Sequence, residues 1–382
     1  MSKAGRPNPI TNLPGDPCEA APQYVRAIAP YQPGKPISEL ARELGLAESG
    51  IIKLASNENP LGVSPAARAA IEAALPELGR YPDGNGFALK SALAGRYGVP
   101  PERIVLGNGS NDVLEMVAIA FLGPGRSAVY AQHAFAVYPL ATQARGARGI
   151  VVPAKNHGHD LPGMRRAIDA DTRVVFIANP NNPTGTLLSG AELEAFLGDV
   201  PPHVVVVLDE AYNEYLPEAV RYDSRLLLER HRNLVVTRTF SKAYGLAGLR
   251  VGFGLCDAQV ADLLNRVRQP FNVNELALVA AVAALGDAAF VRRSHDLNLA
   301  GMQQLTDGFR RLGLAWIPSS GNFVSVEIPR AKGAGAVFEH LLRQGVIVRP
   351  VGGYGLPDHL RVTVGLPEEN ERFLAALAVA LR

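Results

Sequence analysis

The sequence predicts an α/β protein with a mainly parallel, seven-stranded sheet in a large domain and a smaller α+β domain. Short apolar runs alternate with helix-like segments from about residue 65 to residue 275, a pattern typical of a parallel sheet with helices on both faces. Some runs are apolar at every position, as in strands that are buried on both sides. The seven predicted strands are 104–106, 127–130, 150–152, 174–177, 204–208, 234–237 and 251–255.

The alternating pattern also divides the chain. Residues 65–275 are predicted to form the large domain, and residues 31–64 together with 276–382 the small domain. Apolar runs at 323–328 and 360–364 are predicted strands of the small domain. Residues 1–30 form a predicted N-terminal arm, which is rich in Pro and polar groups and lacks the apolar core of a signal peptide.

Composition excludes several classes of protein. The 382 residues include 38 Lys and Arg against 36 Asp and Glu, so the net charge of +2 gives no basic footprint for nucleic acid. Two cysteines, Cys18 and Cys256, argue against a disulfide framework and for a reducing compartment. No apolar run approaches the length of a membrane span. We therefore expect a cytoplasmic protein that binds neither nucleic acid nor membrane.

The most informative stretch is 239–250, Thr-Phe-Ser-Lys-Ala-Tyr-Gly-Leu-Ala-Gly-Leu-Arg, directly after a predicted strand. A partly buried pocket lined by glycine would lower the pKa of Lys242 by desolvation, as a Schiff-base lysine needs. Thr239 and Ser241 can donate hydroxyls to a phosphate, and Arg250 can bind the same anion bidentately. Taken alone, the stretch is more often a surface loop with an ordinary lysine and arginine.

Two other predicted strands end on side chains that suit a pyridoxal phosphate (PLP) site. Asp209 follows strand 204–208 at the carboxyl end, where open α/β sheets bind ligands, and its carboxylate would keep a pyridine nitrogen protonated. Asn182 follows strand 174–177 and is held extended before a proline, with its amide free to donate. The alternatives are a helix N-cap for Asp209 and a turn residue for Asn182.

A glycine turn, Gly-Asn-Gly-Ser-Asn-Asp at 107–112, predicts an anion site between a strand and a helix that begins near Val113. Free backbone N–H groups at Gly109, Ser110 and Asn111, together with the helix dipole, favour a phosphate there. The third glycine of a dinucleotide fingerprint is missing. A simple turn capped by Ser110 or Asn111 is compatible with the same pattern.

Three motifs occur in a characteristic order: Asn-Pro-Thr-Gly at 182–185, Asp-x-Ala-Tyr at 209–212, and Ser-Lys at 241–242 with Arg250 eight residues on. In this order and spacing they resemble the aspartate-aminotransferase-like, fold-type-I PLP enzymes over residues 30–380. Five further segments are similar to those of histidinol-phosphate aminotransferases. These are 56–60, 80–83, 107–110, 348–349 and 360–365.

The resemblance implies PLP as the cofactor and assigns roles around it. Lys242 would hold the cofactor as a Schiff base and then move a proton as base and acid. Asp209 would pair with the ring nitrogen, and Asn182 and Tyr212 would donate to the phenolate oxygen. Phe135 lies where the family places a ring against the pyridine face, although an aromatic residue in such a loop is otherwise most often core.

On the substrate side, the resemblance implies that Arg361 binds the substrate carboxylate or phosphate. Arg349 is a candidate second cation across a glycine-containing loop, and a surface salt bridge is the alternative for both arginines. Tyr31 is similar to a tyrosine that contacts substrate, with packing as an equal alternative. Tyr81 would reach the cofactor phosphate of a neighbouring subunit, which implies a homodimer with shared active sites.

The implied reaction is ping-pong transamination between L-histidinol phosphate and 2-oxoglutarate, in histidine biosynthesis, giving imidazole acetol phosphate and L-glutamate. Three alternatives stay open: a broad aromatic amino acid aminotransferase, a threonine-phosphate decarboxylase, and a PLP-sensing regulator, which would normally need a DNA-binding module. No DNA-binding module is visible in the sequence. His157 and His159 lie in a polar loop where histidines are usually solvated, so we expect no metal site.

Overall fold

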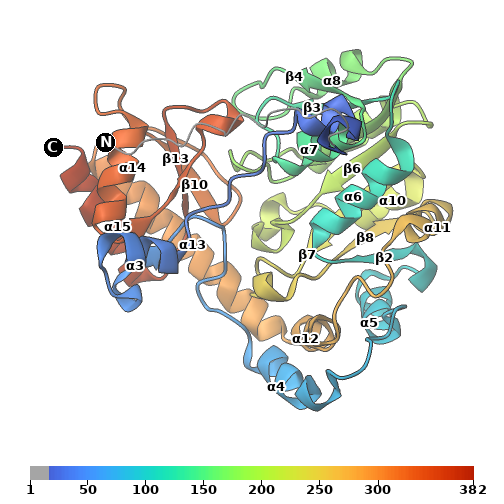
Figure 1. Cartoon of the computed structure of the whole chain (residues 1–382), viewed down its shortest axis with the longest axis horizontal. Coiled ribbons are helices and arrows are strands. Elements are labelled where there is room, and N and C mark those ends of the chain that lie inside the picture. Colours follow the sequence, from blue (N-terminus) through green and yellow to red (C-terminus); the bar gives the residue numbers. More distant parts are fainter. Residues whose placement is uncertain (1–16) are drawn as a thin grey trace.

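The computed structural model describes residues 17–382, which form a seven-stranded sheet, a four-stranded sheet and a separate two-stranded pair, with helices around them (Figure 1). The large sheet has seven strands in the order β2-β8-β7-β6-β5-β3-β4. Its neighbouring strands are parallel except at β8, which is antiparallel to both β2 and β7. The predicted mainly parallel, seven-stranded sheet is confirmed. Its strands are β2 (Ile104–Gly107), β3 (Ser127–Ala131), β4 (Arg148–Val152), β5 (Thr172–Ala178), β6 (Val205–Asp209), β7 (Leu234–Thr239) and β8 (Gly252–Cys256).

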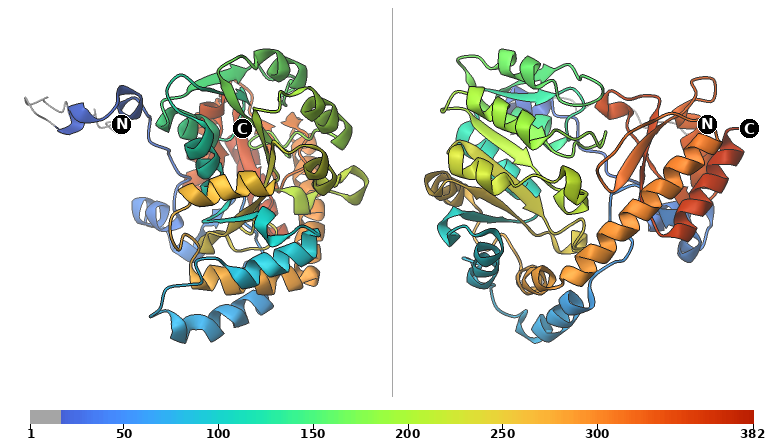
Figure 2. Two further views of the ribbon diagram at one scale, coloured as in Figure 1. Left: turned by 90° about the vertical axis from the view of Figure 1, so that its right-hand side faces the viewer. Right: turned by 180° about the vertical axis from the view of Figure 1, so that it is seen from behind.

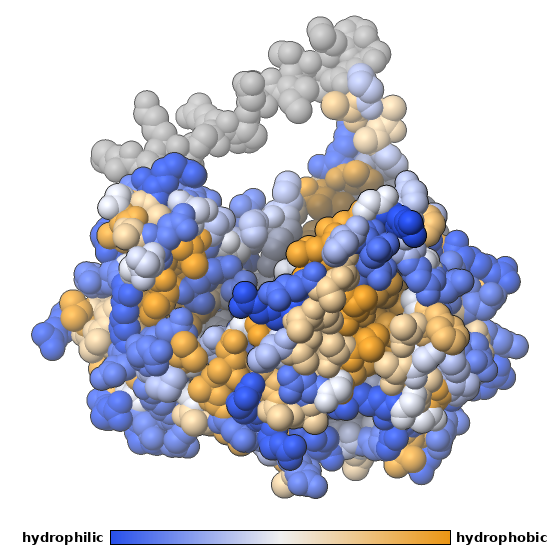
Figure 3. Space-filling view, turned by 90° about the horizontal axis from the view of Figure 1, so that it is seen from below, coloured by the Kyte–Doolittle hydropathy of each residue, from blue (hydrophilic) through white to orange (hydrophobic). Residues whose placement is uncertain are grey.

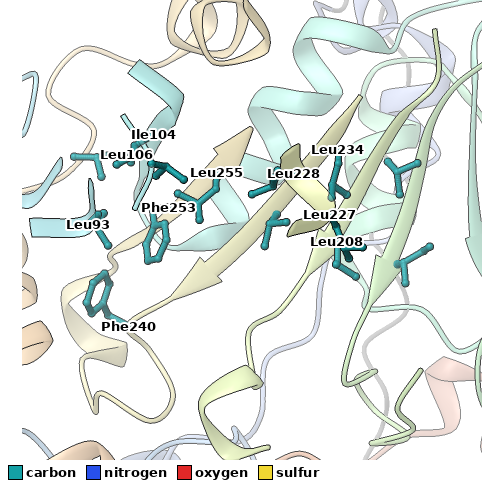
Figure 4. Packing of buried hydrophobic residues seen from close by; sticks show 14 of the residues in the cluster. Leu93, Ile104, Leu106, Leu208, Leu227, Leu228, Leu234, Phe240, Phe253 and Leu255 are labelled. Carbon is teal, nitrogen blue, oxygen red and sulfur yellow. The ribbon is translucent and has the colours of Figure 1, made fainter. Parts of the chain in front are cut away.

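The central strands of the large sheet are buried on both faces. Along β6, Val205 and Val207 pack into one apolar core, and Val206 and Leu208 pack into another on the opposite face. Successive residues of a strand point to opposite faces, so a strand covered on both sides is apolar throughout. Figure 4 shows part of the second core, where leucines from β2, β6, β7 and β8 gather.

Nine helices between residues 65 and 286 surround the large sheet. They are α4 (Pro65–Ala74), α5 (Phe87–Tyr97), α6 (Ser110–Phe121), α7 (Val137–Ala144), α8 (Leu161–Ala167), α9 (Gly190–Asp199), α10 (Ser224–Arg230), α11 (Ala258–Val267) and α12 (Glu275–Gly286). Ala277, Leu278 and Ala280 of α12 belong to the same core as Leu208. We therefore propose that the large domain extends through α12, beyond the boundary at residue 275 that the sequence suggested.

The smaller body is built around an antiparallel sheet in the order β12-β13-β10-β9, with a separate parallel pair, β1 and β11. The long helix α13 runs from beside α12 to this sheet (Figures 1 and 2). The strands are β1 (Ile52–Lys53), β9 (Trp316–Ile317), β10 (Phe323–Glu327), β11 (Val346–Ile347), β12 (Arg349–Pro350) and β13 (His359–Thr363). The helices are α3 (Ile37–Leu44), α13 (Ala288–Arg311), α14 (Ala334–Arg343) and α15 (Pro367–Ala380).

The start of the described chain lies on the large domain. Helices α1 (Pro17–Ala20) and α2 (Gln23–Arg26) lie near α7, where Gln143 Nε2 donates to the carbonyl of Tyr24 at 3.2 Å (Figure 1). The chain then crosses to α3 beside the small sheet. Most of the predicted N-terminal arm, residues 1–16, lies outside the described residues. Within residues 17–382, no helix is both long and apolar enough to span a membrane.

Candidate active site

A cavity of about 230 Å³ opens between the carboxyl ends of the large sheet and the small sheet. It brings together predicted site residues that are scattered over more than three hundred positions of the sequence. Those lining it are Tyr31, Ser110, Asn111, Phe135, Asn182, Asp209, Tyr212, Thr239, Ser241, Lys242, Arg250, Arg349 and Arg361. Gly109 lies beside the cavity, and Tyr81 lies away from it. Parallel strands present their carboxyl ends at one edge, which explains why β5, β6 and β7 all contribute.

Lys242 follows β7 and enters the cavity. Its Nζ donates to the carbonyl of Ser56 at 3.2 Å and lies 5.6 Å from the centre of the Tyr212 ring. Burial lowers the pKa of the ammonium to about 7, and the nearby charge of Arg361 acts in the same direction. Gly245 makes this turn possible, since its φ is +72° and a Cβ atom would lie 1.9 Å from the Gly62 carbonyl. A lysine of this kind holds a neutral, nucleophilic amine near pH 7.

The lowered pKa predicts how the apoprotein captures an aldehyde. Only the neutral amine of Lys242 attacks a carbonyl carbon, so the rate of PLP capture should rise with pH until the pKa near 7 is passed and then level off. The measurement is stopped-flow absorbance between pH 5.5 and 9. A capture rate that still rises between pH 8 and pH 9 would mean that Lys242 has an ordinary lysine pKa.

Asp209 is the last residue of β6, and the two oxygens of its carboxylate differ in their hydrogen bonds. Its Oδ2 accepts a hydrogen bond from the Tyr138 hydroxyl at 2.9 Å, whereas its buried Oδ1 has no hydrogen-bond partner in residues 17–382. Burial raises the pKa of this carboxyl to about 6. A buried carboxylate oxygen without a partner is costly unless a ligand supplies one. A protonated pyridine nitrogen is a donor of the required kind.

Tyr212 and Asn182 stand beside the cavity with their polar ends oriented by neighbours. The Tyr212 hydroxyl accepts from Asn57 Nδ2 at 2.9 Å, and burial raises its pKa to about 12, so the phenol stays protonated and can donate. Asn182 Oδ1 accepts from Arg361 Nη1 at 2.5 Å. This hydrogen bond orients the amide so that its nitrogen is available as a donor.

An anion cradle forms where β7 meets the start of α6. Ser110 and Asn111 are the first residues of α6, and Arg250 Nη1 donates to Ser241 Oγ at 3.1 Å. Gly109, with φ of +77°, admits the arginine, because a Cβ atom there would lie 2.3 Å from Arg250 Nη2. Hydroxyls, a guanidinium and a helix N-terminus converge on one place, which is the composition of a phosphate site.

Arg361 on β13 is a buried cation that has no carboxylate partner among the described residues. Its guanidinium donates to Asn182 and, at 2.7 Å, to the carbonyl of Ala55, while its Nε has no partner. Arg349 donates to the carbonyl of Gln32 at 2.7 Å. Among residues 17–382, neither arginine has a carboxylate within the 4.0 Å of an ion pair, so the alternative of a salt bridge does not hold for that part of the chain. Both charges are available to an anionic substrate.

Tyr354 and Asn57 are among the lining residues that the sequence did not single out, and both lie close to predicted ones. Tyr354 lines the cavity from the loop between Arg349 and Arg361, and its carbonyl is held by His133 Nδ1 at 2.6 Å. Asn57 lies in a segment that carried the family resemblance. Tyr31, 53% exposed, stands at the cavity with its ring 5.7 Å from the Arg349 guanidinium.

Tyr81 and the loop histidines His157 and His159 do not line the cavity. Tyr81 is 82% exposed, and its ring stacks on Phe271 at 4.8 Å. His159 is buried rather than solvated, and burial lowers its pKa to about 4. No group of three or more potential metal ligands gathers around it or elsewhere within residues 17–382.

The donor set fits PLP. Asp209 Oδ1 lacks a partner, Lys242 offers an amine, and the cradle at α6 offers donors for a phosphate. Residues 49–377 match the family model of class I and II aminotransferases. The fold and the site are thus those of an aminotransferase of this class, and PLP, the predicted cofactor, is the one that its residues fit.

Similar proteins narrow the family. The chain is 63% identical over 364 residues to histidinol-phosphate aminotransferase 2 of Nitrosospira multiformis, covering 95% of this chain and 92% of that protein. It is 62% identical to histidinol-phosphate aminotransferase 2 of Pseudomonas fluorescens, covering 97% and 99%. The crystal structure of histidinol-phosphate aminotransferase from Sinorhizobium meliloti in complex with pyridoxal-5'-phosphate superposes with a TM-score of 0.87 at 28% identity, covering 94% and 97%. The chain belongs to the histidinol-phosphate aminotransferase family of class I and II aminotransferases.

Proposed function

We propose that this enzyme transfers the amino group of L-histidinol phosphate to 2-oxoglutarate, giving imidazole acetol phosphate and L-glutamate. The observation that carries the proposal is the pair of arginines at the cavity, Arg361 and Arg349, neither engaged by a carboxylate in the described chain. A phosphate monoester carries close to two negative charges at neutral pH, against one for a carboxylate. The names of the relatives at 62–63% identity support the same substrate.

Different residues of the site are suited to different parts of the cofactor. Thr239, Ser241 and Arg250, with the N-terminus of α6, would hold the cofactor phosphate. Asp209 would keep the ring nitrogen protonated, and Tyr212 and Asn182 would donate to the phenolate oxygen. PLP, when bound, supplies an electron sink for the bonds of the substrate carbon.

Lys242 is the residue that accepts and returns the substrate proton. With a pKa near 7, its Nζ carries a lone pair in a large share of the molecules at neutral pH, so it can accept the proton that leaves the substrate carbon and then return it. Arg361 holds the anionic end of the substrate and thereby fixes which proton faces the lysine. The same guanidinium can hold the phosphate of one substrate and a carboxylate of the other, because both anions accept from its fork.

The experiment that tests the substrate assignment is Arg349→Ala. Loss of this second cation should weaken catalysis with histidinol phosphate by about 2–4 kcal/mol in kcat/KM, the range for breaking a desolvated charged hydrogen bond. Glutamate should lose less, because its carboxylate is bound by Arg361. Arg330→Ala, an arginine that is paired with Asp358 on the surface, serves as the control and should change neither substrate. Equal losses for both substrates would move the assignment to an aromatic amino acid aminotransferase.

We further propose a homodimer in which Tyr81 completes the site of the partner. Large apolar side chains are exposed on the segment between α4 and α5, at Leu75 and Leu78, and at the start of α5, where Phe87 is 75% exposed. Figure 3 views the side of the molecule on which α4 lies, and apolar residues gather there among polar ones. Tyr81 belongs to this segment and is too exposed to serve a site within its own chain.

We also propose a cytoplasmic location, since the 382 residues include only two cysteines, which makes a disulfide framework improbable.

Subunit mixing tests the shared site. Tyr81→Phe removes a phosphate donor and should lower activity about tenfold, as expected for one hydrogen bond to a charged group. Mixed with inactive Lys242→Ala subunits, it should form hybrids with one intact site and one site that lacks both groups. Activity in the mixture should therefore exceed the sum of the two parents. Activity that never exceeds this sum would mean that each site is built from one chain.

A further inference from the structure

A buried ion-pair cluster lies behind the cofactor site and takes no part in the chemistry above. It consists of Arg238 on β7 and of Glu210 and Glu214, which follow β6. Arg238 donates to Glu210 Oε2 from Nη2 at 2.6 Å and from Nε at 2.9 Å, and its Nη1 donates to Glu214 Oε1 at 3.2 Å. The three side chains are 9%, 0% and 8% exposed. Buried charges are costly and rarely stabilise a fold more than apolar residues would, so the cluster calls for a functional account.

The cluster joins the ends of the two strands that carry cofactor residues. Glu210 directly follows Asp209, and its backbone N–H donates to the Thr237 carbonyl at 2.9 Å. Arg238 precedes Thr239, which lines the cavity. Neighbouring residues in a strand point to opposite faces, so Arg238 points away from the cavity while Thr239 faces it. None of the three charged residues lines the cavity, and a role in the reaction must therefore act through Asp209 or Thr239.

The charges of the cluster bear on Asp209. Burial is the main cause of its raised pKa, and the negative charge of Glu210 raises that pKa further. Within residues 17–382, Arg238 is the cation paired with Glu210. Burial also raises the pKa of Glu214. Arg238 makes two hydrogen bonds to Glu210 and one to Glu214, so Glu210 is its principal partner. The remaining titratable groups around the cluster are Arg96, Tyr97, Tyr215, Tyr222, Asp223, Arg225 and Tyr244. Burial raises the pKa of each of these tyrosines, so they are uncharged. Asp223 and Arg225 form an ion pair with each other, so their charges compensate.

We propose that Arg238 is a positioning residue for the cofactor: it neutralises Glu210, so that Asp209 keeps the negative charge that binds the ring nitrogen, and it holds the ends of β6 and β7 together. The arrangement places a compensating cation one residue from Thr239 and a carboxylate one residue from Asp209. The proposal concerns PLP alone. Its test uses no substrate, so its failure would leave the assignment of histidinol phosphate untouched.

Two variants break the same ion pair but have opposite effects on Asp209. Arg238→Met leaves Glu210 unpaired beside Asp209 and favours protonated Asp209, whereas Glu210→Gln removes the negative charge and favours ionised Asp209. The dissociation constant of PLP, measured by titrating apoprotein, should rise at least about tenfold in Arg238→Met, the change that accompanies one pKa unit. It should stay within about threefold of the parent in Glu210→Gln and in the double variant Glu210→Gln/Arg238→Met.

Controls separate this effect from loss of stability. Arg103→Met removes a guanidinium that donates to the carbonyls of Cys256 and Leu228 outside the cavity, so it should lower the melting temperature of the apoprotein without changing PLP affinity. If Arg238→Met does not fold, Arg238→Lys keeps the charge without the fork and should retain affinity within about threefold. The proposal is overturned if Arg238→Met binds PLP as tightly as the parent does. It is equally overturned if Glu210→Gln loses as much affinity as Arg238→Met, because the ion pair would then act only as a structural tie.

Discussion

Lys242→Ala should abolish transamination, with a loss of at least about 10⁴-fold in kcat, because one side chain provides both the nucleophile and the proton carrier. The observation behind this expectation is a buried amine whose pKa is lowered to about 7 inside the cavity. Borohydride reduction of the parent should fix PLP covalently to the peptide that contains Lys242. The variant should show no such adduct by mass spectrometry.

Lys53→Ala is the matched control for this substitution. Lys53 lies on β1 and pairs with Glu58 at 3.2 Å outside the cavity, so its removal should leave the adduct and the turnover unchanged. Unchanged turnover in Lys242→Ala would instead remove the basis for the whole assignment of the site.

Asp209→Asn should have the second-largest effect, about 10²- to 10³-fold in kcat, the range found when a fixed electrostatic partner is removed from a reacting group. The neutral amide is close in size to the carboxylate, so the variant should still bind PLP. It cannot hold the ring nitrogen protonated, and the electron sink is weakened. The measurement is kcat at saturating PLP, with cofactor content determined by absorbance.

Tyr138→Phe provides a graded comparison. It removes the hydrogen bond to Asp209 Oδ2 but keeps the carboxylate charge, so the loss should be only about tenfold. Near-normal turnover of Asp209→Asn with cofactor correctly bound would mean that Asp209 supports the structure only.

The sequence was sufficient where one local pattern determines the structure. The all-apolar run of β6 predicts a strand buried on both faces, and the position of Asp209 after that run predicts an edge where parallel strands meet. The strand direction of β8 could not be predicted in this way, since the length and apolarity of a run carry no information about direction. The apolar residues of α12 likewise gave no sign of which sheet they pack against.

Site residues that belong to local sequence motifs could be predicted, whereas residues placed by contacts between distant segments could not. Lys242, Asp209 and Asn182 belong to local patterns whose chemistry can be read from a few neighbours. Tyr138 contacts Asp209, and Arg238 contacts Glu210, only because folding brings α7 and β7 next to β6, and neither residue stands in a pattern that singles it out. Tyr354 belongs to a glycine-rich loop whose path depends on His133 of the large domain.

The most direct test of the central claim is turnover of the purified protein with four amino donors: histidinol phosphate, phenylalanine, tyrosine and threonine phosphate, each with 2-oxoglutarate. Two arginines without carboxylate partners at one cavity predict a kcat/KM for histidinol phosphate at least about tenfold above that for either aromatic amino acid, a difference of about 1.4 kcal/mol. Threonine phosphate should release no carbon dioxide. A higher kcat/KM for phenylalanine or tyrosine, or decarboxylation of threonine phosphate, would contradict the proposed function.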